Sequence, residues 1–155
     1  MKKLMIIAAA VFAAIASNAA TVKWSSSGLI GLDGSKAGAD YSILVTVVSD
    51  TTDTFKSGSE FGPVSYKSGM VATQTAGDTG SNLGTIVFSA TAYGPAGATL
   101  DLGSVTQAIE DAGSTYTLKF VANNSKDDWA AAPEPTSGML LLIGVAGLAL
   151  RRRRA

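Results

Sequence analysis

The chain has 155 residues, of which 46% are hydrophobic and 15% charged, and it contains neither cysteine nor histidine. The missing residue types exclude disulfides, thiol nucleophiles, Ser-His-Asp triads and ordinary zinc sites. Formal charge is zero overall, but residues 20–132 carry six lysines against eleven acidic residues, a net charge of −5 that argues against nucleic acid as a partner.

Residues 1–19 have the three parts of a secretory signal peptide. Two lysines follow the first methionine, residues 4–16 form an uncharged apolar run, and the small residues of the tripeptide SNA stand where signal peptidase reads the chain. We predict cleavage after Ala19, which makes Ala20 the mature N-terminus. Cleavage after Ala20 would put Asn18 at a position that prefers a small residue. The expected partners are signal peptidase and the general secretion machinery.

Residues 20–132 predict an extracytoplasmic, mainly β domain. The three clearest strands are residues 40–50, 84–94 and 115–123, which are rich in β-branched and aromatic residues. In the second and third of these, apolar residues alternate with polar ones, the pattern of a half-buried strand. Weaker strand candidates are residues 21–24, 28–32, 63–66, 69–73 and 99–102.

One short helix is predicted between Ser104 and Gly113. Ser104 stands three residues before Gln107, which is the spacing of a capping box, and apolar residues after it would share one helical face. Several short strands with one small helix predict a small antiparallel β-sandwich of jelly-roll or immunoglobulin-like type. Residues 126–132 are expected to be the end of this fold or the start of a linker.

Two acidic features of the domain have residue types that catalysis or metal binding needs. Asp78–Ser81 spells DTGS, a string found in aspartic proteases, but those enzymes need two such aspartates. A glycine-rich hairpin loop is the better interpretation, so no catalytic residue is assigned. Carboxylates at positions 50, 53 and 60, or at 127 and 128, are suitable for calcium. They lack the spacing of a known calcium loop, so solvated turns are expected and no metal site or cofactor is assigned.

Aromatic residues are few, at 7% of the chain. Six of them are candidates for a platform on which sugars stack: Trp24, Tyr41, Tyr66, Tyr93, Tyr116 and Trp129. Most of these lie in predicted strands, which favours packing in the core.

The C-terminal segment, residues 133–155, consists of a short motif, an apolar run and a basic tail. The motif is Pro133, Glu134 and Pro135, and a transmembrane helix is predicted at about residues 137–150. Its apolar side chains are Met139, Leu140, Leu141, Leu142, Ile143, Val145, Leu148 and Leu150. The basic tail is Arg151, Arg152, Arg153 and Arg154, which would stay in the cytoplasm and stop translocation.

The apolar run is short for a permanent membrane span. Residues 139–150 would extend roughly 18 Å as a helix, whereas the hydrocarbon core of a bilayer is about 30 Å thick. Snorkelling arginines close part of that difference. The two prolines of the motif lack N–H groups and hold the chain extended, which keeps the motif accessible to an enzyme.

This order of motif, apolar helix and terminal arginine cluster, over residues 132–155, resembles the PEP-CTERM sorting signal of Gram-negative bacteria. The resemblance implies that exosortase, an integral membrane transpeptidase-like enzyme, recognises the segment and cleaves it near Pro133, Glu134 and Pro135. The catalytic residues belong to that enzyme. The resemblance also implies an inner-membrane intermediate, then a place at the cell surface or outside the cell, in association with exopolysaccharide, biofilm or floc material.

We therefore expect a non-catalytic surface or matrix protein that is sorted by its C-terminus. Three alternatives remain open. The first is a carbohydrate-binding module delivered by the same route, with extracellular polysaccharide as its partner. The second is a plain membrane-anchored surface protein that is never cut. The third is an enzyme in which a pair of acids carries the chemistry.

Overall fold

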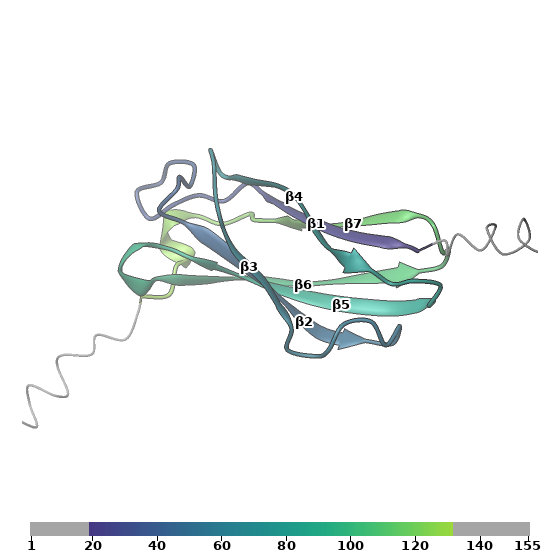
Figure 1. The fold of residues 1–155 in the computed structure, drawn as a ribbon. Helices are drawn as coiled ribbons and strands as arrows, with labels where there is room; N and C mark the ends of the chain where they lie inside the picture. Colours follow the sequence, from purple (N-terminus) through teal and green to yellow (C-terminus); the bar gives the residue numbers. More distant parts are fainter. Residues whose placement is uncertain (1–18, 132–155) are drawn as a thin grey trace, which may run out of the picture.

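The structure is a computed structural model that describes residues 19–131 (Figure 1). Apart from Ala19, the predicted signal peptide and the segment 133–155 lie outside the described residues. The strands are β1 (Thr21–Ser27), β2 (Ser42–Asp50), β3 (Glu60–Ser65), β4 (Met70–Asp78), β5 (Gly84–Tyr93), β6 (Thr99–Ile109) and β7 (Thr115–Val121). Two single-turn 3-10 helices are η1 (Pro95–Gly97) and η2 (Lys126–Asp128).

The strands form two sheets that face each other as two layers (Figure 1). One sheet has three strands in the order β4-β1-β7, and the other has four in the order β3-β2-β5-β6. The prediction of a mainly β domain is therefore confirmed. One pair differs from the antiparallel expectation, because β1 runs parallel to β7 over the full length of both strands.

The strand count fits one of the two predicted architectures better than the other. Seven strands in sheets of three and four correspond to a constant-type immunoglobulin domain, whereas a jelly roll has eight. The connections differ from that domain, in which the first strand pairs with the second. Here β1 pairs with β4 and β7. The likeness to the immunoglobulin type is therefore one of layers and strand number.

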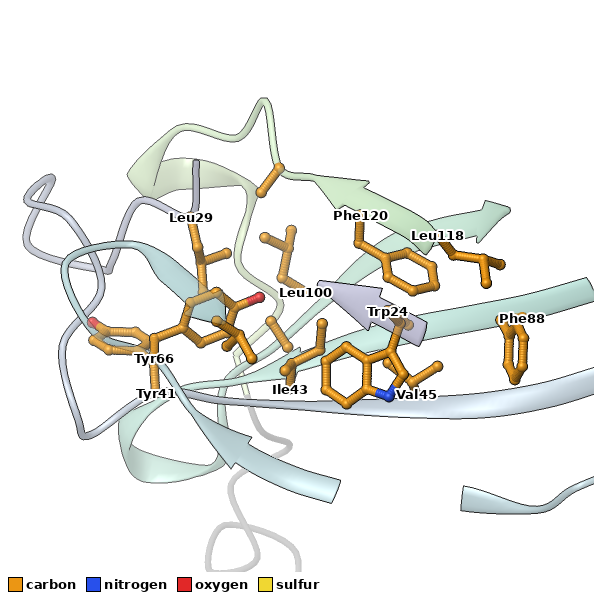
Figure 2. Packing of buried hydrophobic residues seen from close by; sticks show 14 of the residues in the cluster. Trp24, Leu29, Tyr41, Ile43, Val45, Tyr66, Phe88, Leu100, Leu118 and Phe120 are labelled. Carbon is orange, nitrogen blue, oxygen red and sulfur yellow. The ribbon is translucent and has the colours of Figure 1, made fainter. Parts of the chain in front are cut away.

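The core lies between the two sheets and contains apolar side chains from both. Figure 2 shows Trp24 and Phe120 from the three-stranded sheet meeting Ile43, Val45 and Phe88 from the other. The predicted alternation is confirmed in two strands. The buried faces are Ile86, Phe88, Ala90 and Ala92 in β5, and Leu118 and Phe120 in β7, continued by Ala122 just beyond it.

Two polar groups inside this core are hydrogen-bonded to each other. The hydroxyl oxygens of Ser26 and Tyr66 lie 2.8 Å apart, and both residues are buried. Burial raises the pKa of Tyr66 to about 12, although the hydrogen bond with Ser26 lowers it in part. The pair joins the three-stranded sheet to the segment that follows β3, so the two layers are connected by a polar contact as well as by packing.

The predicted helix at 104–113 is wrong, because β6 continues through it to Ile109. The strand pairs with β5 along its length, and four of its residues, Asp101 to Ser104, face only three of β5, Ser89 to Thr91, through a bulge. Gly103 has a φ of 78° in this bulge. The bulge changes which alternate residues of β6 point into the core. Val105 and Ile109 both point inward, and their spacing of four residues also fits one face of a helix. Ala108, placed on the same face by the helix prediction, is exposed.

The weaker strand candidates gave a mixed result. Four of the five coincide with longer strands, β1, β3, β4 and β6, except that Tyr66 lies just after β3 and Gly69 just before β4. The fifth, residues 28–32, is not a strand. It belongs to a loop that folds back through an isolated bridge between Ile30 and Lys36. Gly28 has a φ of 84° directly after β1, which ends the extended conformation there.

Candidate functional site

The last part of the fold is a strap, which we define as Ser125–Ala130. It begins with a capping box, in which the Ser125 hydroxyl accepts from Asp127 N at 3.3 Å and the Asp128 carboxylate accepts from Ser125 N. Trp129 is 8% exposed. Its Nε1 donates to Ile30 O at 2.9 Å, and its ring centroid lies 5.3 Å from that of Tyr41. The strap is therefore anchored by a buried aromatic residue.

The strap ends in a two-hydrogen-bond bridge to the main body. Ala130 N donates to Thr99 O at 2.8 Å, and Thr99 N donates to Ala130 O at 3.0 Å. Residues 126–130 are thus the end of the fold, the first of the two predicted alternatives. Three peptide units then separate Ala130 from Pro133, and covalent geometry limits the distance between their Cα atoms to about 11 Å. The predicted sorting motif is covalently tied to the immediate surface of the domain.

The N-terminal end of the described chain lies at the opposite end of the layers (Figure 1). Ala20 is fully buried. Its N–H donates to Gly80 O at 3.2 Å, and its carbonyl accepts from Thr79 N at 2.8 Å. The neighbouring Ala19 is only partly buried. The predicted cleavage site therefore coincides with the boundary between a residue that belongs to the fold and one that lies at its surface.

The DTGS stretch forms a loop, as expected, but not a hairpin. Asp78 is the last residue of β4 and is exposed, and its carboxylate accepts from Thr21 Oγ1 at 2.7 Å. Thr79 is buried against Ala20. The loop leads from β4 in one sheet to β5 in the other, so it crosses between the layers. Asp78 fixes the start of β1, which is a structural role.

Asp50 organises the loop after β2. One of its carboxylate oxygens accepts from the N–H and hydroxyl of Thr52, both at 2.6 Å, and the other accepts from Thr54 N at 3.0 Å and Phe55 N at 2.7 Å. Partial burial raises the pKa of Asp50, but these hydrogen bonds outweigh burial and leave the pKa below its ordinary value. Both carboxylate oxygens of Asp50, which would have to bind calcium, already accept hydrogen bonds from the protein.

The other candidate calcium ligands do not gather around Asp50 or elsewhere. Asp128 is engaged in the capping box of the strap. Within residues 19–131, no three side chains of the types Asp, Glu, His or Cys lie close enough together to hold a metal ion.

The six aromatic residues do not form a shared platform. Trp24 and Tyr66 are buried in the core, and Tyr41 packs on Trp129 of the strap. The Tyr116 hydroxyl accepts from Glu110 N at 3.1 Å and Asp111 N at 2.9 Å in the turn before β7. Tyr93 is the most exposed of the six, at 39%. Packing in the core and at turns accounts for the others.

A groove on the outer face of the three-stranded sheet was not predicted. It has a volume of about 420 Å³ and is lined by residues from β1, β4 and β7 together with Lys67: Ser25, Ser26, Ser27, Lys67, Met70, Val71, Ala72, Thr73 and Lys119. Ser25 lies beside Lys119 in the register of β1 and β7. The alternation in β7 predicted that Lys119 faces outward. The parallel pairing that puts it next to Ser25 has no local signal in the sequence.

Comparison with known protein families gives one match, to the residues that directly follow the strap. The family model of the PEP-CTERM protein-sorting motif matches residues 131–154, which begin directly after Ala130. The chain therefore carries a PEP-CTERM sorting motif, and the resemblance is confirmed over this segment. No curated protein matches the chain. No solved structure matches it.

The helices that the structure describes between residues 19 and 131 are too short to cross a membrane. The predicted transmembrane helix at 137–150, the motif at Pro133, Glu134 and Pro135, and the arginines from Arg151 to Arg154 lie outside the described residues.

Proposed function

We propose that this chain, an exported protein whose PEP-CTERM motif is handled by exosortase at the membrane, is a non-catalytic component of the cell surface or extracellular matrix. The observation that carries the proposal is the position of the sorting motif. It begins at Ala131, immediately after a β domain whose last residue is bridged to Thr99. The β domain is the part of the chain that is delivered, and the segment after it is the sorting signal.

The environment of three acids that the sequence singled out, one for catalysis and two for calcium, supports a non-catalytic role. Asp78 accepts from Thr21, Asp50 holds a loop, and Asp128 caps the strap. Each carboxylate has a structural partner within the domain. An enzymatic alternative would need Asp78 to act as an acid or base. Protease and glycosidase assays of wild type and Asp78→Asn test it, and an activity that this substitution abolishes would refute the proposal.

The environment of Ala20 supports cleavage after Ala19. Ala20 contributes both a donated and an accepted backbone hydrogen bond to the end of the domain. Cleavage after Ala20 would remove these contacts. We propose that mature protein begins at Ala20 and that exosortase removes the C-terminal segment, at least from Met139 onward, after an inner-membrane intermediate with its C-terminus in the cytoplasm.

Mass spectrometry of both termini tests this sequence of events. The protein is recovered from cells and from the medium of the producing strain, and of a strain that lacks exosortase. We expect a start at Ala20 in both strains, and loss of the segment from Met139 onward in the first strain alone. A Glu134→Ala variant should behave like the exosortase-deficient strain, and Thr136→Ala serves as the matched control. Surface material that still ends at Ala155 would support the uncut membrane anchor instead.

A further inference from the structure

We infer that the groove over β4, β1 and β7 binds an acidic polysaccharide, with Lys67 and Lys119 contacting its carboxylate or sulfate groups. This inference rests on the proposed function, because a protein placed at the cell surface meets such polymers. It names the surface of the domain that would hold the polymer, and the chemical class of that polymer.

The charge on this face is opposite to that of the whole domain. Residues 20–132 have a net charge of −5. Lys23 and Lys119 nevertheless point outward from β1 and β7, and Lys67, at the start of the turn that leads into β4, lines the groove. The three strands contain one acidic residue, Asp78. It lies beside Thr21, whereas the groove begins at Ser25, about 13 Å further along β1 at 3.3 Å per residue.

The register brings the cationic groups together. Lys119 pairs with Ser25, and Lys23 pairs with Thr117, so the two lysines lie diagonally across adjacent strands on one face. With strands about 4.8 Å apart and a rise of about 3.3 Å per residue, such diagonal neighbours have Cα atoms about 8 Å apart. Lys67 lines the same groove as Lys119. A linear polymer with one acidic group per sugar presents repeated charges that match several ammonium groups, and the acidic remainder of the domain leaves this face as the favoured one.

The remaining side chains of the groove suit sugars better than a protein or a bilayer. Ser25, Ser27 and Thr73 supply hydroxyl groups that can donate to and accept from sugar hydroxyls. Met70 is 56% exposed and offers a flexible apolar contact for the C–H face of a sugar ring. The outward residues of β1 and β7 are otherwise Thr, Ser and Lys, apart from Val121, whereas β4 contributes the apolar Met70 and Ala72. The apolar area of the groove is nevertheless far below the roughly 800 Å² per partner that a stable protein interface buries.

Binding measurements on the processed protein, recovered from the producing cells, test the inference. The probes are polygalacturonate and dextran sulfate as acidic polymers, and dextran as the neutral control. We expect binding to an acidic polymer that weakens as salt rises from about 50 to 300 mM, because salt screens exposed charges. Lys67→Gln and Lys119→Gln should each weaken it several-fold, and the double variant roughly tenfold or more. Lys56→Gln, in the loop between β2 and β3, removes the same charge elsewhere and should leave binding unchanged.

Other occupants of the groove give different results. Binding to dextran as strong as that to the acidic polymers, or a loss of binding in Lys56→Gln as large as in the groove variants, would overturn the inference. So would binding to phosphatidylglycerol vesicles without binding to either acidic polymer, and so would a dimer in gel filtration that the double variant abolishes. The termini of every variant are checked by mass spectrometry. Wild-type protein that is processed and exported normally but binds neither acidic polymer refutes this inference alone, whereas unprocessed wild-type protein refutes the proposed function.

Discussion

Asp50 shows how much of this domain depends on single polar residues. Its carboxylate accepts four hydrogen bonds from residues 52–55, and no charged partner is needed for the loop to hold. Asn82 Nδ2 donates to Thr52 O at 2.8 Å, which connects this loop to the one that follows Asp78. A single carboxylate thereby supports the end of the domain at which Ala20 is buried.

We expect Asp50→Asn to lower the free energy of unfolding by about 1–3 kcal/mol at pH 7, because an amide offers one acceptor oxygen to four donors. The folded pKa of Asp50 lies below its unfolded value, so its contribution is present above about pH 4 and is lost as pH falls through the folded pKa. Urea unfolding from pH 7 to pH 3 should show the difference between wild type and variant shrinking.

Asp53→Asn is the matched control for that experiment. Asp53 has a φ of 58°, which asparagine tolerates. We expect little change in stability for this variant. An Asp50→Asn deficit that is as large at pH 3 as at pH 7 would contradict the role assigned to the charged carboxylate.

At the scale of the elements, two glycines show two different reasons why a position needs glycine: a left-handed backbone conformation, and a lack of space for a side chain. Gly103 has a φ of 78° in the bulge of β6, and an added Cβ would meet no atom within 4 Å. Gly28 has a φ of 84° after β1, and its Cβ would lie 2.6 Å from the carbonyl oxygen of Ala122. The first position requires a left-handed conformation, and the second requires that conformation and a missing side chain.

We expect Gly103→Ala to destabilise the domain by about 1 kcal/mol, the cost of the left-handed conformation for alanine. Gly28→Ala should cost more, on the order of 2–4 kcal/mol, because a backbone carbonyl cannot move aside without disturbing β7. Thermal unfolding of the two variants and wild type measures the difference. Equal costs would show that the contact with Ala122 does not constrain the native state.

The strands that the sequence predicted well are those whose apolar residues alternate without interruption. The inward faces of β5 and β7 follow from Phe88 and Phe120 and their neighbours two residues away. Residues 99–102 of β6 were predicted as a strand, but its continuation to Ile109 was missed because the bulge at Gly103 changes the phase of the alternation. A local pattern cannot distinguish that change from a helical period. The same limit applies to the pairing of β1 with β7, which brings together residues about 94 positions apart.

Only those parts of the candidate site that consist of a local sequence motif could be predicted. The PEP-CTERM segment has a linear signature, so residues alone indicated it. The strap that precedes it depends on Trp129 reaching Ile30 and Tyr41, contacts across about a hundred residues. The groove depends in the same way on three strands meeting. Neither arrangement leaves a pattern within any single stretch of sequence.

At the scale of the whole molecule, we expect the folded domain to limit how closely exosortase can approach the motif. The folded domain ends three peptide units before Pro133. Inserting six Gly-Ser residues between Ala131 and Ala132 should therefore speed C-terminal processing, because the domain no longer crowds the enzyme. Pulse-chase labelling of the producing cells measures the rate. The same insertion after Gly34, in an exposed turn, is the control, and equal rates for both insertions would contradict a steric role of the domain.

The parallel pairing of β1 and β7 has a mechanical consequence. Ala20 leads into β1 at one end of the layers, and the chain leaves through Ala130 at the other (Figure 1). A force that pulls these two ends apart acts along β1 and β7, so the hydrogen bonds from Thr21–Thr115 to Ser27–Val121 must break together in shear and cannot unzip one by one. The domain should therefore resist a force applied between its two ends more strongly than a force that peels a single strand from the edge of a sheet.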